Sequence, residues 1–257
     1  MKILVIGDVT SPKGIEHLEK TLWKVRDANK IDLTIVNGEN ASFVTGISRE
    51  LSERLIKAGA DVITGGNHTL YNRAAYSYLD ETKKVLRPIN FGNAAPGRGY
   101  TIADAQGYRV LVINAMGNVH IEPTLDSPFS HIDRVLSENE GKYDFSVLDI
   151  HAEATGEKLA IGYAYDGKIN VIFGTHTHVP TADEQILPHG TGYISDVGMC
   201  GESGGILGMN AELVVERMRT KVPIKFAAAT GEVKANGVIF ILNQSTAKVE
   251  SVERITF

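Results

Sequence analysis

Five short apolar runs in this chain are each followed at once by a cluster of polar donor residues. Strands that are buried on both faces of a parallel sheet appear as continuous apolar runs. Ligands of open α/β sheets gather at the carboxyl ends of such strands. The pattern therefore predicts a site built from several strand ends. The clusters are Gly7-Asp8, Gly38-Glu39-Asn40, Gly66-Asn67-His68, Asp149-Ile150-His151 and Gly174-Thr175-His176-Thr177-His178.

The last of these clusters carries two histidines two positions apart. Side chains at i and i+2 of an extended chain point to the same side, so we expect His176 and His178 to reach neighbouring points of one pocket. Carboxylate, amide and imidazole donors together suit divalent manganese, iron or zinc, and no thiolate accompanies them. The clusters hold more donors than one metal ion needs. They therefore predict a two-metal hydrolytic centre.

Each donor also has an ordinary structural interpretation. A histidine beside a strand is more often packed or solvated than bound to a metal, and a carboxylate after a strand often caps a helix. From the residues alone, Asn40 and Asn67 are better explained as turn residues in the left-handed conformation. The joint occurrence of all five clusters, each directly after an apolar run, favours the metal site.

Composition narrows the class of protein and of substrate. A chain of 257 residues can bury a large core, and we expect one domain over residues 1–257. The net charge of −5 argues against a stable complex with nucleic acid, which needs a basic surface. A small anionic substrate is compatible with bound cations. One cysteine, with no signal peptide and no membrane-spanning stretch, predicts a soluble cytoplasmic protein; a homo-oligomer is left open.

Strand and helix patterns alternate through the first part of the chain. Ile3–Ile6 is typical of a strand buried on both faces, and apolar spacing predicts a helix over 15–28. Ser48 is the expected N-cap of a helix that ends at Gly59. The expected class is α/β (α+β in some schemes), with two sheets packed face to face and helices outside. The other predicted strands are Leu33–Val36, Val62–Thr64, Tyr100–Ala103, Arg109–Asn114, Phe145–Ile150, Asn170–Phe173, Lys225–Ala229, Val233–Leu242 and Val249–Ile255, with helices at Ile132–Asn139 and Thr155–Ile161.

The order of the clusters resembles that of the calcineurin-like metallophosphoesterase superfamily. That superfamily has an Asp after the first strand, an acidic residue after the second, then Gly-Asn-His, a later His and a final Gly-x-His-x-His. The chain is more specifically similar to the bacterial YmdB-type family of 2′,3′-cyclic-nucleotide 2′-phosphodiesterases. The resemblance implies a four-layer αββα sandwich with two mixed sheets. The stretches that carry it are residues 7–9, 37–41, 66–69, 151–155, 174–183 and 195–199.

The same resemblance implies two metal ions, iron or manganese with zinc as a further option. Glu39 is the candidate bridge, because a carboxylate offers two oxygens. The resemblance places Asp8, Asn40 and His178 on the first ion, and Asn67, His151 and His176 on the second.

The implied reaction is the hydrolysis of nucleoside 2′,3′-cyclic phosphates to 3′-phosphates. A hydroxide between the ions would attack phosphorus, and His68 would protonate the leaving 2′-oxygen as general acid. An orienting role for His68 towards that hydroxide is the alternative. The sequence also leaves open a phosphatase, a phosphodiesterase for 3′,5′-cyclic nucleotides or RNA ends, and a non-catalytic regulatory protein.

Three positions depart from the family patterns. The superfamily usually has His two residues after the first Asp, where this chain has Thr10, and Asn40 is the natural replacement ligand. Within the YmdB-type family, Arg usually follows Gly117 and an aromatic residue commonly follows Gly-Asn-His-Thr. This chain has Asn118 and Leu70 there, and we expect both in loops that contact substrate.

Cys200 is expected to be a small packed thiol in a flexible loop at the rim of the site. It lacks the paired base that a nucleophilic cysteine needs. Four further residues are candidates either to fix imidazole tautomers or to serve as strand-end and helix-capping groups. They are Asp149, Glu153, Thr155 and Asp183.

Overall fold

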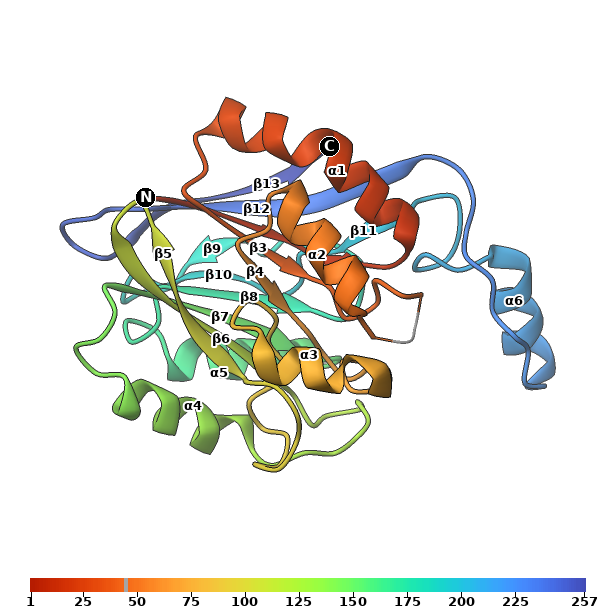
Figure 1. Ribbon diagram of the computed structural model, residues 1–257, viewed down its shortest axis with the longest axis horizontal. Helices are drawn as coiled ribbons and strands as arrows, with labels where there is room; N and C mark the ends of the chain where they lie inside the picture. Colours follow the sequence, from red (N-terminus) through yellow and green to blue (C-terminus); the bar gives the residue numbers. More distant parts are fainter. Residues whose placement is uncertain (44–45) are drawn as a thin grey trace.

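Two mixed β-sheets pack face to face between two layers of helices in the computed structural model, which describes residues 1–43 and 46–257 (Figure 1). The helices α1 (Pro12–Asn29) and α2 (Arg49–Ala58) cover the outer face of one sheet. On the other side, α4 (Pro128–Glu138) and α5 (Thr155–Ala164) cover the second sheet. The expected four-layer αββα sandwich is confirmed.

The first sheet has the strand order β2-β11-β12-β1-β3-β4, and β13 pairs with β12. Its members β1, β3 and β4 are parallel, whereas β1 and β12 are antiparallel. The strands are β1 (Lys2–Ile6), β2 (Asp8–Val9), β3 (Leu33–Asn37), β4 (Val62–Thr64), β11 (Met199–Glu202), β12 (Val233–Leu242) and β13 (Val249–Thr256).

The second sheet has the order β5-β6-β7-β8-β10-β9, with β6, β7, β8 and β10 parallel. Parallel neighbours end at the same edge of a sheet, so the residues that follow β7 and β8 lie together. The strands are β5 (Tyr100–Ala105), β6 (Tyr108–Met116), β7 (Phe145–His151), β8 (Val171–Thr175), β9 (Gln185–Ile186) and β10 (Gly192–Ile194).

Alternate side chains of the buried strands point to opposite faces of the sheets and form three apolar layers. Ile3 and Val5 of β1 pack between the two sheets, while Leu4 and Ile6 pack beneath α1 and α2. A third layer lies between the second sheet and the helices α4 and α5, where Leu148 of β7 is one member. Because both faces of each central strand are buried, the strands read as continuous apolar runs.

The predicted boundaries of α2 agree with the structure, because capping residues mark both of its ends. The Ser48 side chain accepts a hydrogen bond from the Leu51 amide, and α2 gives way to Gly59, whose φ is 122°. The first helix begins at Pro12, earlier than predicted, because Ser11 caps it and Pro suits the first turn.

The prediction of a strand at Lys225–Ala229 is wrong. Only Ala228 in this segment forms a β-bridge, to Met209. The chain on either side is mostly exposed, so the alternating side chains have no sheet to cover. Elements that the sequence analysis did not predict are β2, η1 (Arg73–Ala75), α3 (Tyr76–Glu81), β9, β10, β11 and α6 (Ala211–Thr220).

The helix α6 projects from the body of the molecule (Figure 1). Val214 is its only buried residue, so it lacks the wide apolar stripe by which a packed helix is recognised in a sequence. Within the described ranges, each helix is too short or too polar to cross a membrane.

Candidate metal centre

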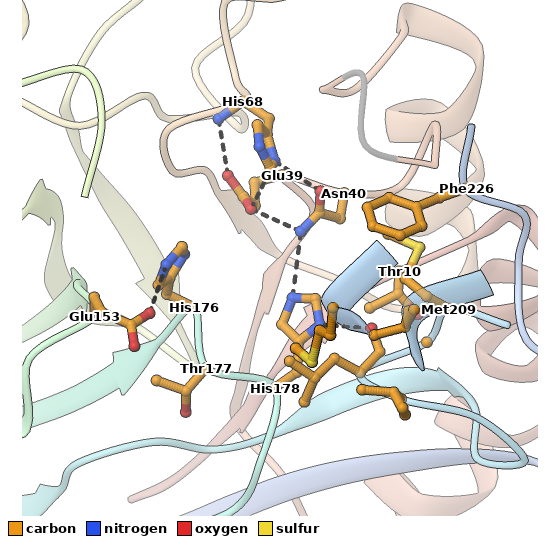
Figure 2. A pocket seen from close by; sticks show the side chains of 15 residues that line it. Thr10, Glu39, Asn40, His68, Glu153, His176, Thr177, His178, Met209 and Phe226 are labelled. Atoms are coloured by element: carbon orange, nitrogen blue, oxygen red, sulfur yellow. Dashed lines mark hydrogen bonds and ion pairs between the residues drawn. The ribbon is translucent and has the colours of Figure 1, made fainter. Parts of the chain in front are cut away.

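The seven candidate ligands and His68 meet at the carboxyl ends of strands from both sheets, and Figure 2 shows part of this site. Ligand atoms of Glu39, His151 and His176 all lie within 4.8 Å of one another. The structure thus brings together every residue that the sequence analysis assigned as a metal ligand or as the general acid. Asp8 lies in β2, Glu39 and Asn40 follow β3, Asn67 and His68 follow β4, His151 ends β7, and His176 and His178 follow β8.

His176 and His178 do not lie in extended chain, as the sequence analysis had assumed. Strand β8 ends at Thr175, and the two histidines have φ angles of 101° and 64°. Both still line the same pocket. A left-handed turn, not the alternation of a strand, therefore gives them their common direction.

A buried ion pair holds this turn in place. The Thr177 amide donates to Asp196 Oδ2 at 3.0 Å, and Lys158 Nζ of α5 lies 2.8 Å from the same oxygen. The side chains of Lys158 and Asp196 are 2% and 1% exposed. Since residues with positive φ are strained unless their surroundings fix them, this pair positions both candidate ligands.

Each of three imidazoles has one nitrogen occupied by an acceptor that is not itself a candidate ligand. The Thr175 hydroxyl donates to Asp149 at 2.8 Å and so accepts from His151 Nδ1 at 2.9 Å. His176 Nε2 lies 3.1 Å from Glu153, and His178 Nδ1 donates to the Leu207 carbonyl at 3.1 Å. The outer acceptor selects the tautomer, which leaves the other nitrogen as a lone-pair donor.

The freed nitrogens point towards one another and towards oxygen donors. His151 Nε2 lies 3.2 Å from His176 Nδ1 and 3.0 Å from Asn67 Oδ1. Burial lowers the pKa of His151 well below its usual value, and it also lowers that of His176. Both shifts favour the neutral ring, which is the form that binds a metal. Several lone pairs gathered at this spacing fit a cation between them.

Asp8 gives independent evidence that the site suits a cation. Its Oδ2 accepts from the His176 amide at 3.1 Å, but its buried Oδ1 has no hydrogen-bond partner. Burial, with the nearby carboxylates of Glu39 and Asp196, raises the pKa of Asp8 well above its usual value. A buried carboxylate oxygen without a partner is costly, and a metal ion would satisfy it. The donor set therefore fits divalent cations.

Asn40 and Asn67 both enter the site, and the left-handed turn proposed as their alternative role is wrong. Neither is among the residues with positive φ in the described chain. Asn67 directs its oxygen at His151, whereas Asn40 directs Oδ1 at His68 Nδ1 (2.8 Å) and Nδ2 at His178 Nε2 (3.3 Å). Coordination by Asn40 oxygen on the His178 side thus requires its amide to turn over.

His68 lies at the mouth of the site, and the shift of its pKa is opposite to those of His151 and His176. Its Nδ1 hydrogen bonds to Asn40, so Nε2 is the nitrogen left for a ligand in the pocket. Burial opposes its charge, but the hydrogen bond and negative charge of Glu39 outweigh burial and raise the pKa of His68. The Tyr71 ring packs against it, with centroids 5.0 Å apart. This histidine is thus suited to carry a proton.

Gly66 keeps the strand end after β4 close to the ligands. A Cβ at this position would overlap His151 Nε2 and Glu39 Oε2. Glycine is therefore required so that the backbone can approach the candidate ligands directly.

A family model described as YmdB-like protein matches residues 4–255. The chain belongs to the YmdB-like family. It is 41% identical to the 2′,3′-cyclic-nucleotide 2′-phosphodiesterase of Bacillus subtilis (strain 168) over 255 residues, 99% of this chain and 96% of that protein. A crystal structure of a hypothetical protein from Thermus thermophilus has a TM-score of 0.92 at 35% identity and covers 100% of this chain and 99% of its own. The structure of a novel phosphatase from Mycoplasma pneumoniae has a TM-score of 0.92 at 32% identity, with coverages of 100% and 93%.

The two departures from the YmdB-like pattern do not line the pocket beside the metal centre, contrary to expectation. Asn118 instead shapes its own loop, where it accepts from the Leu125 amide and donates to the Asp126 carbonyl. Leu70 packs against the apolar layer beneath α1 and α2. Both residues therefore act on local structure.

Cys200 is packed and buried, as predicted, but it lies in β11 and not in a flexible loop. Its thiol donates to the Gly14 carbonyl, and burial raises its pKa. A thiol in this setting is not a nucleophile.

Of the four candidate tautomer-fixing residues, two act on the imidazoles. Glu153 contacts His176 directly, and Asp149 acts on His151 through Thr175. Burial raises the pKa of Asp149 to about 7, against hydrogen bonds from Thr64, Thr175 and Asn37 that favour its charged form. The other two do not: Thr155 begins α5, and Asp183 receives hydrogen bonds from Ser195.

The sequence analysis missed the residues that hold the ligands in place. Thr175 sits inside a motif that had been identified, so its hydroxyl could have been considered. The Leu207 carbonyl and Lys158 carry no signal in the sequence, because long-range packing alone brings them to the site. Asp196 lies in one of the stretches that carry the family resemblance, but its contact with the turn could not be predicted from that stretch.

Proposed function

We propose that this protein is a metal-dependent phosphodiesterase that opens nucleoside 2′,3′-cyclic phosphates at the 2′-ester and releases 3′-phosphates. The observation that carries the proposal is the meeting of the freed nitrogens of His151 and His176 beside Glu39, together with the buried Oδ1 of Asp8, which has no hydrogen-bond partner and lies 3.8 Å from His178 Nε2. The name of the B. subtilis relative, whose whole length this chain nearly spans, supports the cyclic phosphate as substrate.

Two metal ions are proposed, iron or manganese with zinc as a further option. Bound ions would polarise the phosphoryl oxygens and activate water as the nucleophile. Glu39 is proposed as the residue shared by both, because its two oxygens face different partners: Oε1 accepts from Asn40, and Oε2 lies 3.5 Å from His151. The other ligands would be Asp8, Asn40 and His178 on one side, and Asn67, His151 and His176 on the other.

His68 supplies the proton in this proposal. Glu39 favours its protonated form, and the hydrogen bond to Asn40 orients the ring with Nε2 available to the substrate. As the bond from phosphorus to the 2′-oxygen breaks, Nε2 donates its proton to that oxygen. A positioned acid of this kind contributes on the order of 10²–10⁴ in rate.

Phosphomonoester hydrolysis is the second candidate, because the M. pneumoniae protein of the same fold and full-length similarity is described as a phosphatase. The same ligands would serve both reactions. A non-catalytic role is less well supported, since all seven candidate positions carry a competent donor. We also propose a cytoplasmic location, which a single buried cysteine supports.

The test uses protein stripped of metal and then loaded with manganese, ferrous iron or zinc. Adenosine 2′,3′-cyclic phosphate, adenosine 3′,5′-cyclic phosphate and 3′-AMP are incubated separately, and phosphorus NMR identifies the products. We expect the 3′-phosphate alone from the first substrate, and no product from Asp8→Asn. A mixture of 2′- and 3′-phosphates would contradict a single fixed acid. Turnover of 3′-AMP alone would favour the phosphatase.

A further inference from the structure

A cavity of about 350 Å³ opens directly beside the candidate ligands, and its two halves differ in chemistry. One half is formed by Glu39, Asn40 and the histidines. Figure 2 shows Met209 and Phe226 on the opposite side of this pocket from Glu153 and His176. We call this second half the apolar wall. Its side chains are Ile206, Leu207, Met209, Val214, Met218 and Phe226.

The apolar wall is attached to the metal centre itself. The carbonyl of Leu207 accepts the hydrogen bond that orients His178. The backbone of Gly208, at a φ of 84°, lies so close to Thr10 that a Cβ there would come within 3.0 Å of its hydroxyl. Thr10 follows Asp8 by two residues. Loop 206–209 therefore sets a fixed distance between the apolar side chains and the candidate ligands.

The wall is more exposed than apolar groups of a packed core. Leu207 is 45% exposed and Met218 is 65% exposed, and α6 buries only Val214. The guanidinium of Arg217 lies over the Phe226 ring at 4.8 Å from its centroid. Apolar groups that line a concave site and remain open to water are typical of a ligand-binding surface.

We propose that the apolar wall binds the nucleobase of the substrate, an inference that rests on the proposed function. The cyclic phosphate and the base lie at opposite ends of one nucleotide. The polar and apolar halves lie on opposite sides of one cavity, so a phosphate bound in the polar half would leave the base beside the apolar wall. Phenylalanine and methionine side chains contact the face of an aromatic ring. The side chains of the wall carry no N–H, O–H or oxygen acceptor, so they cannot distinguish the edges of the bases.

Two consequences follow for specificity. All four bases should be accepted, with purines favoured over pyrimidines by a few-fold because their faces are larger. A substrate that lacks the base should bind about 5- to 150-fold more weakly, the range that stacking on an aromatic side chain supplies. The loss should fall on KM and leave kcat nearly unchanged, because the reacting phosphorus lies in the other half.

The experiment measures binding and turnover separately on the manganese-loaded protein. Calorimetry compares Kd for 3′-AMP with Kd for ribose 3-phosphate, and kinetics compares adenosine 2′,3′-cyclic phosphate with methyl riboside 2,3-cyclic phosphate. Phe226→Ala and Met218→Ala should each reduce the preference for the ligand that carries a base. Met218 is largely exposed, so its variant should fold. Val215→Ala is the matched control, because Val215 is an exposed apolar residue of α6 outside the cavity lining.

The outcomes separate this inference from the proposed function. Equal Kd values for 3′-AMP and ribose 3-phosphate in the wild type would overturn the inference, even if cyclic phosphates are hydrolysed. An unchanged preference in both wall variants, or an equal loss in Val215→Ala, would also overturn it. Base-dependent binding that Phe226→Ala abolishes, without hydrolysis of any cyclic phosphate, would support the wall and refute the proposed function. A hundredfold preference for one base would overturn the inference, because it would show that the base edges are read.

Discussion

Replacing Lys158 by methionine should weaken the fold at the turn that carries His176 and His178. Lys158 Nζ lies 2.8 Å from Asp196 Oδ2, and both side chains are almost completely buried. Methionine fills most of the same volume but leaves the carboxylate without its cation. Removing one partner of a buried pair costs about 3–5 kcal/mol.

The expected loss lies at the lower end of this range. Asp196 keeps hydrogen bonds from the amides of Thr177 and Gly198, so its charge stays partly compensated. A loss of about 3 kcal/mol corresponds to a fall of roughly 6–12 °C in Tm for a protein of this size. Thermal unfolding followed by circular dichroism measures it. The proteins are first stripped of metal, because bound ions would add stability of their own.

The double variant Lys158→Met/Asp196→Asn is the matched control. It removes the unpaired charge, so it should be more stable than Lys158→Met. A Tm of the single variant within about 2 °C of wild type would refute the reasoning, since this amounts to less than about 1 kcal/mol. A double variant no more stable than the single one would also refute it, because the penalty would then not come from the buried charge.

Three further results are expected. His68→Ala should retain both metals, as measured by elemental analysis, while kcat falls about 10²–10⁴-fold; loss of metal would make His68 a ligand. Gly66→Ala should lose metal in the same analysis, because the added methyl group overlaps His151 and Glu39, and full metal content would show that the loop can move aside. Cys200→Ser should keep most of its activity in a phosphodiesterase assay, since a serine hydroxyl can replace the hydrogen bond to the Gly14 carbonyl; a collapse in turnover with fold and metals intact would point to a chemical role for the thiol.

The sandwich could be predicted because strands that are buried on both faces are apolar throughout, which is visible in the sequence. Ile3–Ile6 is apolar throughout since alternate residues face the helices and the opposite sheet. Ser48 and Gly59 mark their helix by local capping chemistry, which a sequence displays directly. By contrast, α6 buries little apolar surface, and β11 depends on pairing with strands far away in the chain. Neither leaves a periodic pattern.

Part of the candidate site could likewise be predicted from the sequence, and part could not. The donors lie in short motifs directly after strands, so their identity and their convergence could be predicted from order and spacing. Their orientation could not. His178 owes its tautomer to a backbone carbonyl, which every residue possesses, and His176 and His178 owe their direction to a turn that Asp196 fixes from outside.

The pairing of β1 has a consequence for the order in which this protein can fold. The strand that leads to Asp8 lies between β3 and β12, with Lys2 opposite Ile241 and the amino terminus bonded to the Leu242 carbonyl. During synthesis, β1 can pair with β12 only after residues 233–242 have been made. Contacts at such separation slow folding. Asp8, the first candidate ligand along the chain, is therefore fixed only after β12 has been synthesised, and a nascent chain that ends before β12 cannot complete the candidate metal centre.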